Sequence, residues 1–157
     1  MSNALKLIIS TAVPLIVGFT ASFFTITAVG SWYQTINKPS WNPPDWIFAP
    51  IWTTLYIMMG IAFFLVWRTL ADKSVKRSAI ILFILQLIAN FFWSFIFFNQ
   101  HQIALAFAEI IVLWLLILLT IFSFAKVSKL AAWLLVPYII WVSFASILTY
   151  TIWQLNR

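Results

Sequence analysis

The segment from Trp32 to Tyr56 reads Trp-Tyr-Gln-Thr-Ile-Asn-Lys-Pro-Ser-Trp-Asn-Pro-Pro-Asp-Trp-Ile-Phe-Ala-Pro-Ile-Trp-Thr-Thr-Leu-Tyr. It holds four of the six prolines and four of the ten tryptophans of the chain. Proline fixes φ and pushes the residue before it toward an extended backbone, so Asn42-Pro43-Pro44 is predicted to be stiff and polyproline-like, with Trp41 at its head. A stiff backbone that presents aromatic rings is suited to act as a lid for a flat ligand.

The sequence on either side of this segment is too apolar for a soluble protein of its size. The 157 residues are 64% hydrophobic and 8% charged, with a mean hydropathy of +1.05, so the chain is expected to lie in a lipid bilayer. The net charge of +6 would suggest nucleic acid in a soluble protein, but here the basic residues separate apolar runs and orient the chain, so no nucleic-acid partner is expected. Cysteine is absent and His101 is the only histidine, so no metal site is expected either.

Five apolar segments are each near the length of about 20 residues that crosses a hydrocarbon core as a helix. They cover residues 5–29, 46–68, 78–98, 103–125 and 130–153. Strand-like alternation is absent, which disfavours a transmembrane barrel. We therefore predict an all-α integral membrane protein, a five-transmembrane-helix bundle in which residues 1–157 form one domain and residues 30–45 form the lid loop. The first run is longer than the apolar stretch of a cleaved signal peptide, so it is interpreted as a retained helix.

The basic residues predict the orientation of the bundle. With five spans, seven of them fall on one side of the membrane, namely Lys6, Arg68, Lys73, Lys76, Arg77, Lys126 and Lys129. Lys38 and Arg157 fall on the other side. The positive-inside rule then predicts a cytoplasmic N-terminus, in what is expected to be a bacterial plasma membrane.

The start of the second segment carries two expectations. Asp45 is a good N-cap residue, so the helix is predicted to begin near it. Pro50 would then lie past the first turn, where its ring clashes with the turn before it, and a kink or a loose first turn is predicted there. Either would angle Trp46 and Trp52 toward the mouth of the bundle. In the first segment, Gly18 and Ser22 form a small-xxx-small pair that lets another helix approach closely.

Polar residues on the third segment give the clearest functional pattern. Gln86, Asn90 and Ser94 are spaced four apart and share one helix face, with Trp93 beside them. Amide side chains are costly in hydrocarbon unless they are paired. The pattern is typical of hydrogen bonding between helices, and equally of a polar strip on a cavity wall. Both interpretations can hold together.

The last two apolar segments contain two more features of interest, a helix face that could line a cavity and a single acidic residue. Tyr138, Trp141, Ala145 and Thr149 fall on one face of the last segment. Ala145 is small where its neighbours are large, which makes room for a guest. Glu109 is the only acid inside an apolar segment, and a structural or orienting role is favoured over proton relay because no basic residue within the membrane pairs with it.

The order of these residues resembles that of the TspO/MBR family, the translocator proteins, also called tryptophan-rich sensory proteins or peripheral benzodiazepine receptors. The resemblance covers nearly the whole chain, and its most specific part is the Trp-x-Pro-Pro motif of Trp41 to Pro44. The matching runs are Trp32-Tyr33, Lys38 to Pro44, Pro50 to Tyr56, Met59-Gly60, Gln86, Asn90, Trp93-Ser94, Phe97-Phe98, Pro137-Tyr138, Trp141 and Phe144-Ala145.

The resemblance implies a five-helix bundle, commonly a homodimer, with a ligand cavity under the first loop. The implied ligands are porphyrins and related tetrapyrroles such as protoporphyrin IX and haem, sterols or other lipids in some members, and synthetic isoquinoline carboxamides and benzodiazepines. A porphyrin or haem would be a ligand, and no cofactor is expected. The implied ligand-binding positions are Tyr33, Trp41, Trp52, Asn90, Trp93, Trp141 and Ala145.

Two positions depart from the family pattern. Gln154 stands where many members have a basic residue of a sterol-recognition pattern, which argues against sterol binding beside Tyr150. Thr149 replaces an asparagine that is common in relatives.

Three functions are weighed. The first is a membrane receptor or transporter-like protein that binds porphyrins in a cavity within the bundle and serves tetrapyrrole transport, sensing or stress regulation. Indoles stacked on a macrocycle would contribute about 0.5–1.5 kcal/mol per contact beyond burial. The alternative is a light-dependent porphyrin-degrading enzyme that uses Trp52 and Trp141, since no acid–base or nucleophile set supports other catalysis. The third is a structural membrane scaffold.

Overall fold

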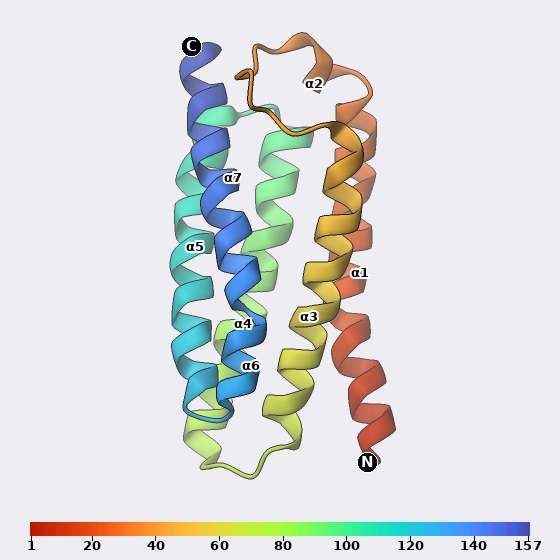
Figure 1. The fold of residues 1–157 in the computed structure, drawn as a ribbon, viewed down its shortest axis with the longest axis vertical. Coiled ribbons are helices and arrows are strands. Elements are labelled where there is room, and N and C mark those ends of the chain that lie inside the picture. Colours follow the sequence, from red (N-terminus) through yellow and green to blue (C-terminus); the bar gives the residue numbers. More distant parts are fainter.

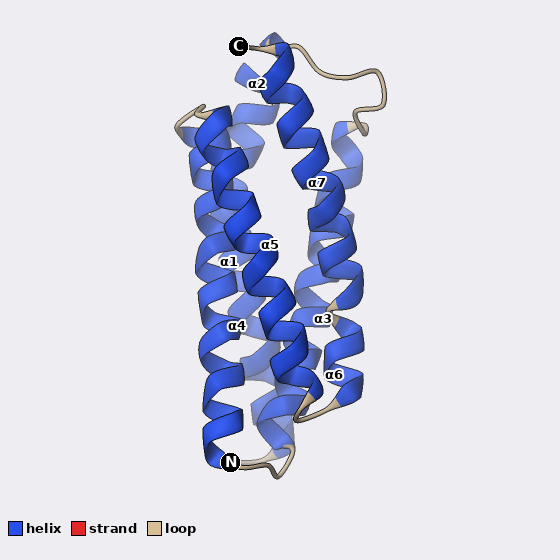
Figure 2. Cartoon of the chain, turned by 90° about the vertical axis from the view of Figure 1, so that its left-hand side faces the viewer, coloured by secondary structure: helices blue, strands red, loops and turns tan.

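The computed structural model describes residues 1–157, and its regular secondary structure is entirely helical, without strands (Figure 2). The elements, in chain order, are α1 (Asn3–Val29), α2 (Trp32–Thr35), the 3₁₀ turn η1 (Asp45–Ile47), α3 (Phe48–Arg68), α4 (Lys73–Ser94), the π-helical turn η2 (Phe95–Asn99), α5 (Ile103–Ala125), α6 (Lys129–Leu134) and α7 (Val136–Leu155).

Five helical stretches are long and apolar enough to cross a membrane. They are Asn3–Val29, Asp45–Arg68, Lys73–Asn99, Ile103–Ala125 and Lys129–Leu155. The predicted fold class and the number of spans are therefore confirmed, and the chain is a multi-pass integral membrane protein. The third span begins at Lys73 rather than at Ser78, because Asp72 caps α4 by accepting the backbone N–H groups of Ser74 at 2.8 Å and Val75 at 3.3 Å.

The bundle has two distinct ends (Figure 1). The N-terminus, the α3–α4 link and the α5–α6 link lie at one end, which we call the basic end because it carries Lys6, Arg68, Lys73, Lys76, Arg77, Lys126 and Lys129. The C-terminus, α2 and the loop between α1 and α3 lie at the other end, which we call the lid end.

Packing between the helices leaves a space near the lid end. α3 packs on α1 and α6, and α5 packs on α4, α6 and α7, whereas α3 and α7 make little direct contact. The buried apolar side chains accordingly form two clusters. The larger one runs from α3 through α7 and includes Met59, Phe83 and Ile117. The smaller one lies at the lid end and includes Tyr33, Phe97 and Ile152.

The structure at the start of α3 differs from the sequence-based expectations for Asp45 and Trp46 and agrees with the one for Pro50. Asp45 is not an N-cap, because Pro44 precedes η1 without a side-chain cap and the Asp45 carboxylate accepts from Gln34 instead. Trp46 is 73% exposed and does not line the cavity that lies under the loop, so the expectation for this residue is not met. The loose first turn expected from Pro50 is the 3₁₀ turn η1, which precedes the α-helix. Pro50 therefore lies within the first turn of α3. Backbone N–H groups in a first turn have no partner within the helix, so the lack of an N–H at proline removes no hydrogen bond.

Two glycines set the close approach of α1 and α3. A Cβ at Gly18 would clash with the ring of Tyr56, and a Cβ at Gly60 would lie 2.5 Å from the Cα of Thr11. Gly60 therefore faces the backbone of α1 directly. The close approach expected from Gly18 and Ser22 is confirmed at Gly18, whereas Ser22 lies one turn nearer the lid, in the wall of a cavity.

Gly60→Ala is expected to destabilise the bundle by about 1–3 kcal/mol, because the added methyl group forces the backbones of α1 and α3 apart. Gly30→Ala is the matched control, since its Cβ would meet only the Ile26 carbonyl oxygen at 3.7 Å. The measurement is unfolding in detergent, followed by far-UV circular dichroism. Equal stability of the two variants would show that the crossing of α1 and α3 can relax.

Candidate ligand cavity beneath the proline-rich loop

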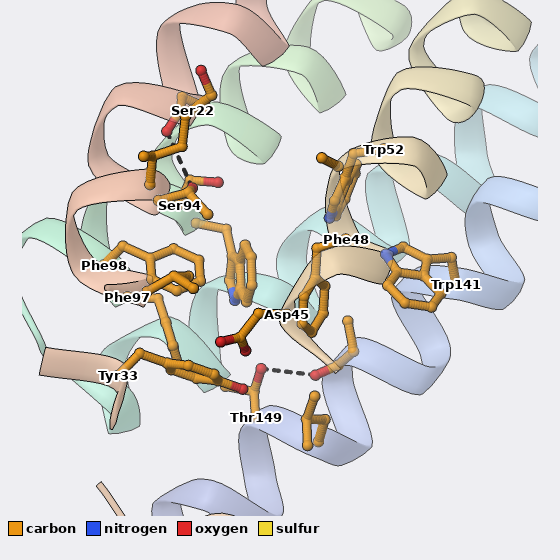
Figure 3. Close-up of a pocket in the computed structure, with 18 of the residues that line it drawn as sticks. Ser22, Tyr33, Asp45, Phe48, Trp52, Ser94, Phe97, Phe98, Trp141 and Thr149 are labelled. Carbon is orange, nitrogen blue, oxygen red and sulfur yellow. Dashed lines mark hydrogen bonds between the residues drawn. The ribbon is translucent and has the colours of Figure 1, made fainter. Parts of the chain in front are cut away.

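A cavity of about 440 Å³ lies between the two apolar clusters, within the size range of small-molecule sites (Figure 3). Side chains from α1, α2, α3, α4, η2 and α7 line it, together with Asp45 of the lid end. Helices α5 and α6 contribute none of the lining. The space is therefore the one left where α3 and α7 stand apart.

In the loop over the cavity, the backbone at Pro44 has the polyproline-like conformation that the sequence predicts. Pro44 has φ −59° and ψ 143°, which is polyproline-like geometry. A turn precedes this stretch, in which the Asn42 N–H donates to the Pro39 carbonyl at 3.0 Å. The short helix α2, which the sequence did not predict, brings Tyr33 under the loop, where this side chain is 3% exposed.

Side chains of the loop form hydrogen bonds with other groups of the same loop. The Tyr33 hydroxyl donates to Asn42 Oδ1 at 2.8 Å, and burial raises the pKa of this phenol to about 12, so it stays a protonated donor at neutral pH. Gln34 Nε2 donates to Asp45 Oδ2 at 2.8 Å. Lys38 Nζ donates to the Tyr33 carbonyl at 2.5 Å and lies over the Tyr33 ring. The loop is thus an ordered cover.

Two contacts fasten this cover to the rest of the bundle. Asn37 and Asn156 exchange hydrogen bonds, from the Asn37 N–H to Asn156 Oδ1 and from Asn156 Nδ2 to the Asn37 carbonyl, both at 2.8 Å. We call this pair the asparagine clasp. On the other side, the ring of Trp32 stacks on the ring of His101 with centroids 4.2 Å apart and planes 6° apart. The clasp joins the loop to the end of α7, and the stack joins it to the α4–α5 link.

Nine of the 22 residues that line the cavity are aromatic. Trp52 stacks on Tyr56 at 5.6 Å, Trp93 stacks on Phe97 at 5.4 Å, and Phe48 packs edge-on against Trp141 at 6.1 Å. Figure 3 shows Trp52, Phe48 and Trp141 on one side and Phe97 and Phe98 on the other. Such a wall offers ring faces and edges to a flat aromatic guest.

The last turn of α4 and the π-helical turn η2 together supply four neighbouring wall residues. Trp93, Ser94, Phe97 and Phe98 all line the cavity. The Gln100 N–H donates to the Phe95 carbonyl at 3.0 Å, an i to i−5 bond that widens the helix at this point. Single π-helical turns inside α-helices occur frequently at functional sites.

Polar groups in the wall are few. Asp45 carries the only carboxylate, and no lysine, arginine, histidine, methionine or cysteine lines the cavity. The indole nitrogens of Trp93 and Trp141 are buried without a hydrogen-bond partner. An unpaired buried donor costs about 1–3 kcal/mol, so a ligand acceptor that reached either N–H after a small ring rotation would recover much of that free energy.

Beneath the cavity, a hydrogen-bond network joins α3, α4 and α7. Tyr56 donates to Asn90 Oδ1 at 2.6 Å, Asn90 Nδ2 donates to the Tyr138 hydroxyl at 2.9 Å, and Tyr138 donates to Gln86 Oε1 at 2.8 Å. Asn90 and Gln86 are therefore used in bonding between helices. Of the strip Gln86, Asn90 and Ser94, only Ser94 reaches the cavity wall.

The structure brings most of the predicted site residues together. Those that line the cavity are Tyr33, Trp52, Trp93, Trp141 and Ala145. Asn90 lies outside the lining, in the network below, and its prediction as a wall residue is corrected accordingly. Trp41 is also outside the lining, because it is 46% exposed and packs edge-on against Phe144, a wall residue, at 5.9 Å. Trp41 is therefore a residue of the rim.

Sequence reasoning missed part of the wall. The α1 residues Ser22, Thr25 and Ile26, the lid-end residues Asp45 and Phe48, and Phe144 and Leu148 of α7 all line the cavity. From the sequence, Ser22 is interpreted as part of a helix-packing pair with Gly18, and the small and polar side chains of α1 are the signal that could have indicated the wall. Glu109 of α5 does not line the cavity.

The fold and the cavity define a class of protein, a multi-pass helical membrane protein with a covered apolar cavity in its bundle. Residues 10–154 match the model of the TspO/MBR family. The chain is 49% identical over 142 residues to the tryptophan-rich protein TspO of Chlorobaculum tepidum, covering 90% of each chain. It is 37% identical over 127 residues to the translocator protein of Homo sapiens, covering 80% of this chain and 75% of that one.

A third relative is the tryptophan-rich sensory protein of Cereibacter sphaeroides, 36% identical over 125 residues, with 80% of this chain and 77% of that one covered. The chain belongs to the TspO/MBR family.

Proposed function

We propose that the chain binds flat, apolar tetrapyrroles of the protoporphyrin type in the covered cavity and acts in their transport, in sensing them or in stress regulation. The observation that carries this proposal is the wall of aromatic rings with two unpaired indole N–H donors under a stiff cover. Ring faces suit the macrocycle, and the indole donors suit its carboxylate or carbonyl oxygens.

The donor set of the wall favours an iron-free macrocycle over haem. Haem iron in proteins is held by histidine, cysteine, methionine or tyrosine, and of these types only Tyr33 and Tyr56 line the cavity. Both tyrosine hydroxyls already donate, to Asn42 and Asn90 respectively. We therefore propose protoporphyrin IX, rather than haem, as the better ligand.

The test is a titration of protoporphyrin IX into the protein in detergent, in the dark, with tryptophan fluorescence as the readout. Saturable quenching with about one porphyrin per chain is expected, and a parallel titration with haem should give weaker binding. Quenching that rises linearly without saturation would contradict the proposal and favour a scaffold whose cavity is incidental.

A second candidate function is light-driven oxidation of the bound porphyrin, with dioxygen as the oxidant. It is favoured by Trp52 and Trp141, which both line the cavity, and by the contacts of Trp52 with Tyr56 and Tyr138. Illumination of the saturated complex separates it from binding alone. Loss of porphyrin absorbance that disappears in Trp52→Phe and Trp141→Phe supports oxidation, whereas stable absorbance supports binding.

The carboxylate of Asp45 in the cavity wall leads to a prediction about how the charge of the ligand affects its affinity. Asp45→Asn is expected to tighten the binding of protoporphyrin IX about two- to fivefold at low salt, because it removes a negative charge that repels the porphyrin carboxylates. The dimethyl ester, which has no charge, should bind both forms equally. Asp72→Asn is the matched control, since Asp72 lies at the basic end and asparagine also caps helices well. Weaker binding by Asp45→Asn would mean that Asp45 accepts a hydrogen bond from the ligand.

We also propose that the basic end lies in the cytoplasm of a bacterial cell and the lid end faces the opposite compartment. The distribution of basic residues supports this orientation. Cysteines introduced at Ser2 and Ser40 should be labelled by membrane-impermeant reagents from opposite sides. Homodimerisation, which the family resemblance implies, stays a prediction for cross-linking in the membrane.

A further inference from the structure

A second hollow lies at the basic end, far from the covered cavity. It has a volume of about 260 Å³ and is lined by Lys73, Lys76, Arg77, Ile80 and Ile81. These positions follow the spacing i, i+3, i+4, i+7 and i+8, so they share one face of α4. Three cations thus stand directly above two isoleucines on the same helix face.

The cations of this hollow have no acidic partner. The chain has three acids, of which Asp45 lies at the lid end and Glu109 in the second turn of α5, which starts at the lid end. The third, Asp72, accepts hydrogen bonds from the backbone of Ser74 and Val75 and from the Ser74 hydroxyl, which lowers its pKa. Lys76 Nζ donates to the Thr69 carbonyl at 2.9 Å, whereas Lys73 and Arg77 donate to no group of the protein. The site therefore has a local excess of positive charge.

Below the cations, the same side of α4 continues as exposed apolar surface. Ile81, Ile84, Leu85 and Ile88 are each between 43% and 48% exposed. At 1.5 Å per residue, Lys73 and Ile88 are about 22 Å apart along the helix, which is about the full thickness of one bilayer leaflet with its headgroups. A positive group at the water edge above an apolar strip is complementary to a phosphate that carries acyl chains.

We propose that this face of α4 binds an anionic phospholipid, with its phosphate between Lys73 and Arg77 beside Lys76 and its acyl chains along Ile81, Ile84 and Ile88. An anionic lipid is proposed because its negative phosphate complements the three positive side chains of the hollow. Basic pockets at the ends of membrane helices bind lipid phosphates, and isoleucines exposed below them would be in contact with lipid chains rather than with water. The inference does not depend on what the covered cavity binds.

The experiment is native mass spectrometry of the full chain in a neutral detergent, with phosphatidylglycerol and phosphatidylcholine of identical acyl chains added in turn. The wild type is expected to retain one phosphatidylglycerol at least about tenfold more tightly than phosphatidylcholine. The variant K73Q/R77Q should lose this preference. The control K126Q/K129Q removes the same charge from the same end of the bundle, outside the hollow, and should keep it.

Three outcomes would overturn the proposal. Equal loss in the two charge-matched variants would indicate a diffuse surface field, and equal retention of the two lipids by the wild type would show no anionic preference. Displacement of phosphatidylglycerol by millimolar inorganic phosphate would show that the apolar strip adds nothing. The two wild-type measurements can overturn the proposal even if the variant folds poorly, and circular dichroism reports its folding.

Discussion

Ala145→Phe is expected to weaken the binding of protoporphyrin IX about ten- to a hundredfold. Ala145 is a buried wall residue on α7 and is flanked by Trp141, Phe144, Leu148 and Thr149, which also line the cavity. A phenyl group at this position would take up space that a flat guest needs. Compressing the guest or its neighbours costs about 1–3 kcal/mol, which is about 5- to 150-fold in affinity and includes the expected range.

The measurement is the same dark titration of tryptophan quenching, with a matched substitution as control. Ala108→Phe places the same ring on the exposed side of α5, away from the cavity. It should leave the affinity within about twofold of the wild type, since a surface change away from special features has a small effect. If Ala145→Phe bound the porphyrin as tightly as Ala108→Phe, the ligand would have to lie outside this cavity.

Tyr138→Phe is expected to lower the free energy of unfolding by about 1–3 kcal/mol. Its hydroxyl accepts from Asn90 and donates to Gln86, so its removal leaves one buried donor and one buried acceptor unpaired. Hydrogen bonds between membrane helices are individually modest, which sets the lower limit of this range. The loss would fall on the junction of α4 with α7.

Unfolding by added sodium dodecyl sulfate, followed by circular dichroism, measures this effect. Tyr150→Phe is the control, because Tyr150 is on the same helix, is 45% exposed and has a hydroxyl without a partner in the protein. Equal stability of the two variants would show that the network below the cavity contributes little. Since Tyr56 joins the network to the cavity floor, Tyr138→Phe should also weaken porphyrin binding, though less than Ala145→Phe does.

The sequence was sufficient for the spans and for several of the aromatic residues that line the cavity. Length and apolarity determine which segments cross a bilayer, and prolines restrict the backbone locally, so the five helices and the stiff loop could be predicted. Trp93, Trp141 and Ala145 lie on helix faces that the sequence pattern marks, and Trp52 lies at the proline-rich start of its segment. Their assignment as ligand-binding positions comes from the family resemblance and stays a prediction.

The limits of sequence reasoning are clear at Asn90. It shares a helix face with Ser94, and spacing alone cannot tell which of the two meets a cavity and which meets a partner side chain. The answer depends on the level at which Tyr56 and Tyr138 approach from other helices. The same holds for Ser22 and Thr25 of α1, whose role depends on where α3 and α7 diverge.

The asparagine clasp bears on how the protein can be handled. Asn156 is one residue from Arg157, so any tag or fluorescent protein fused after Arg157 begins beside the hydrogen bonds that fasten the cover. A fusion before Met1 would instead project from the opposite end of the molecule (Figure 1). Affinities measured with the two placements should therefore differ, and the amino-terminal fusion should preserve the native ligand response.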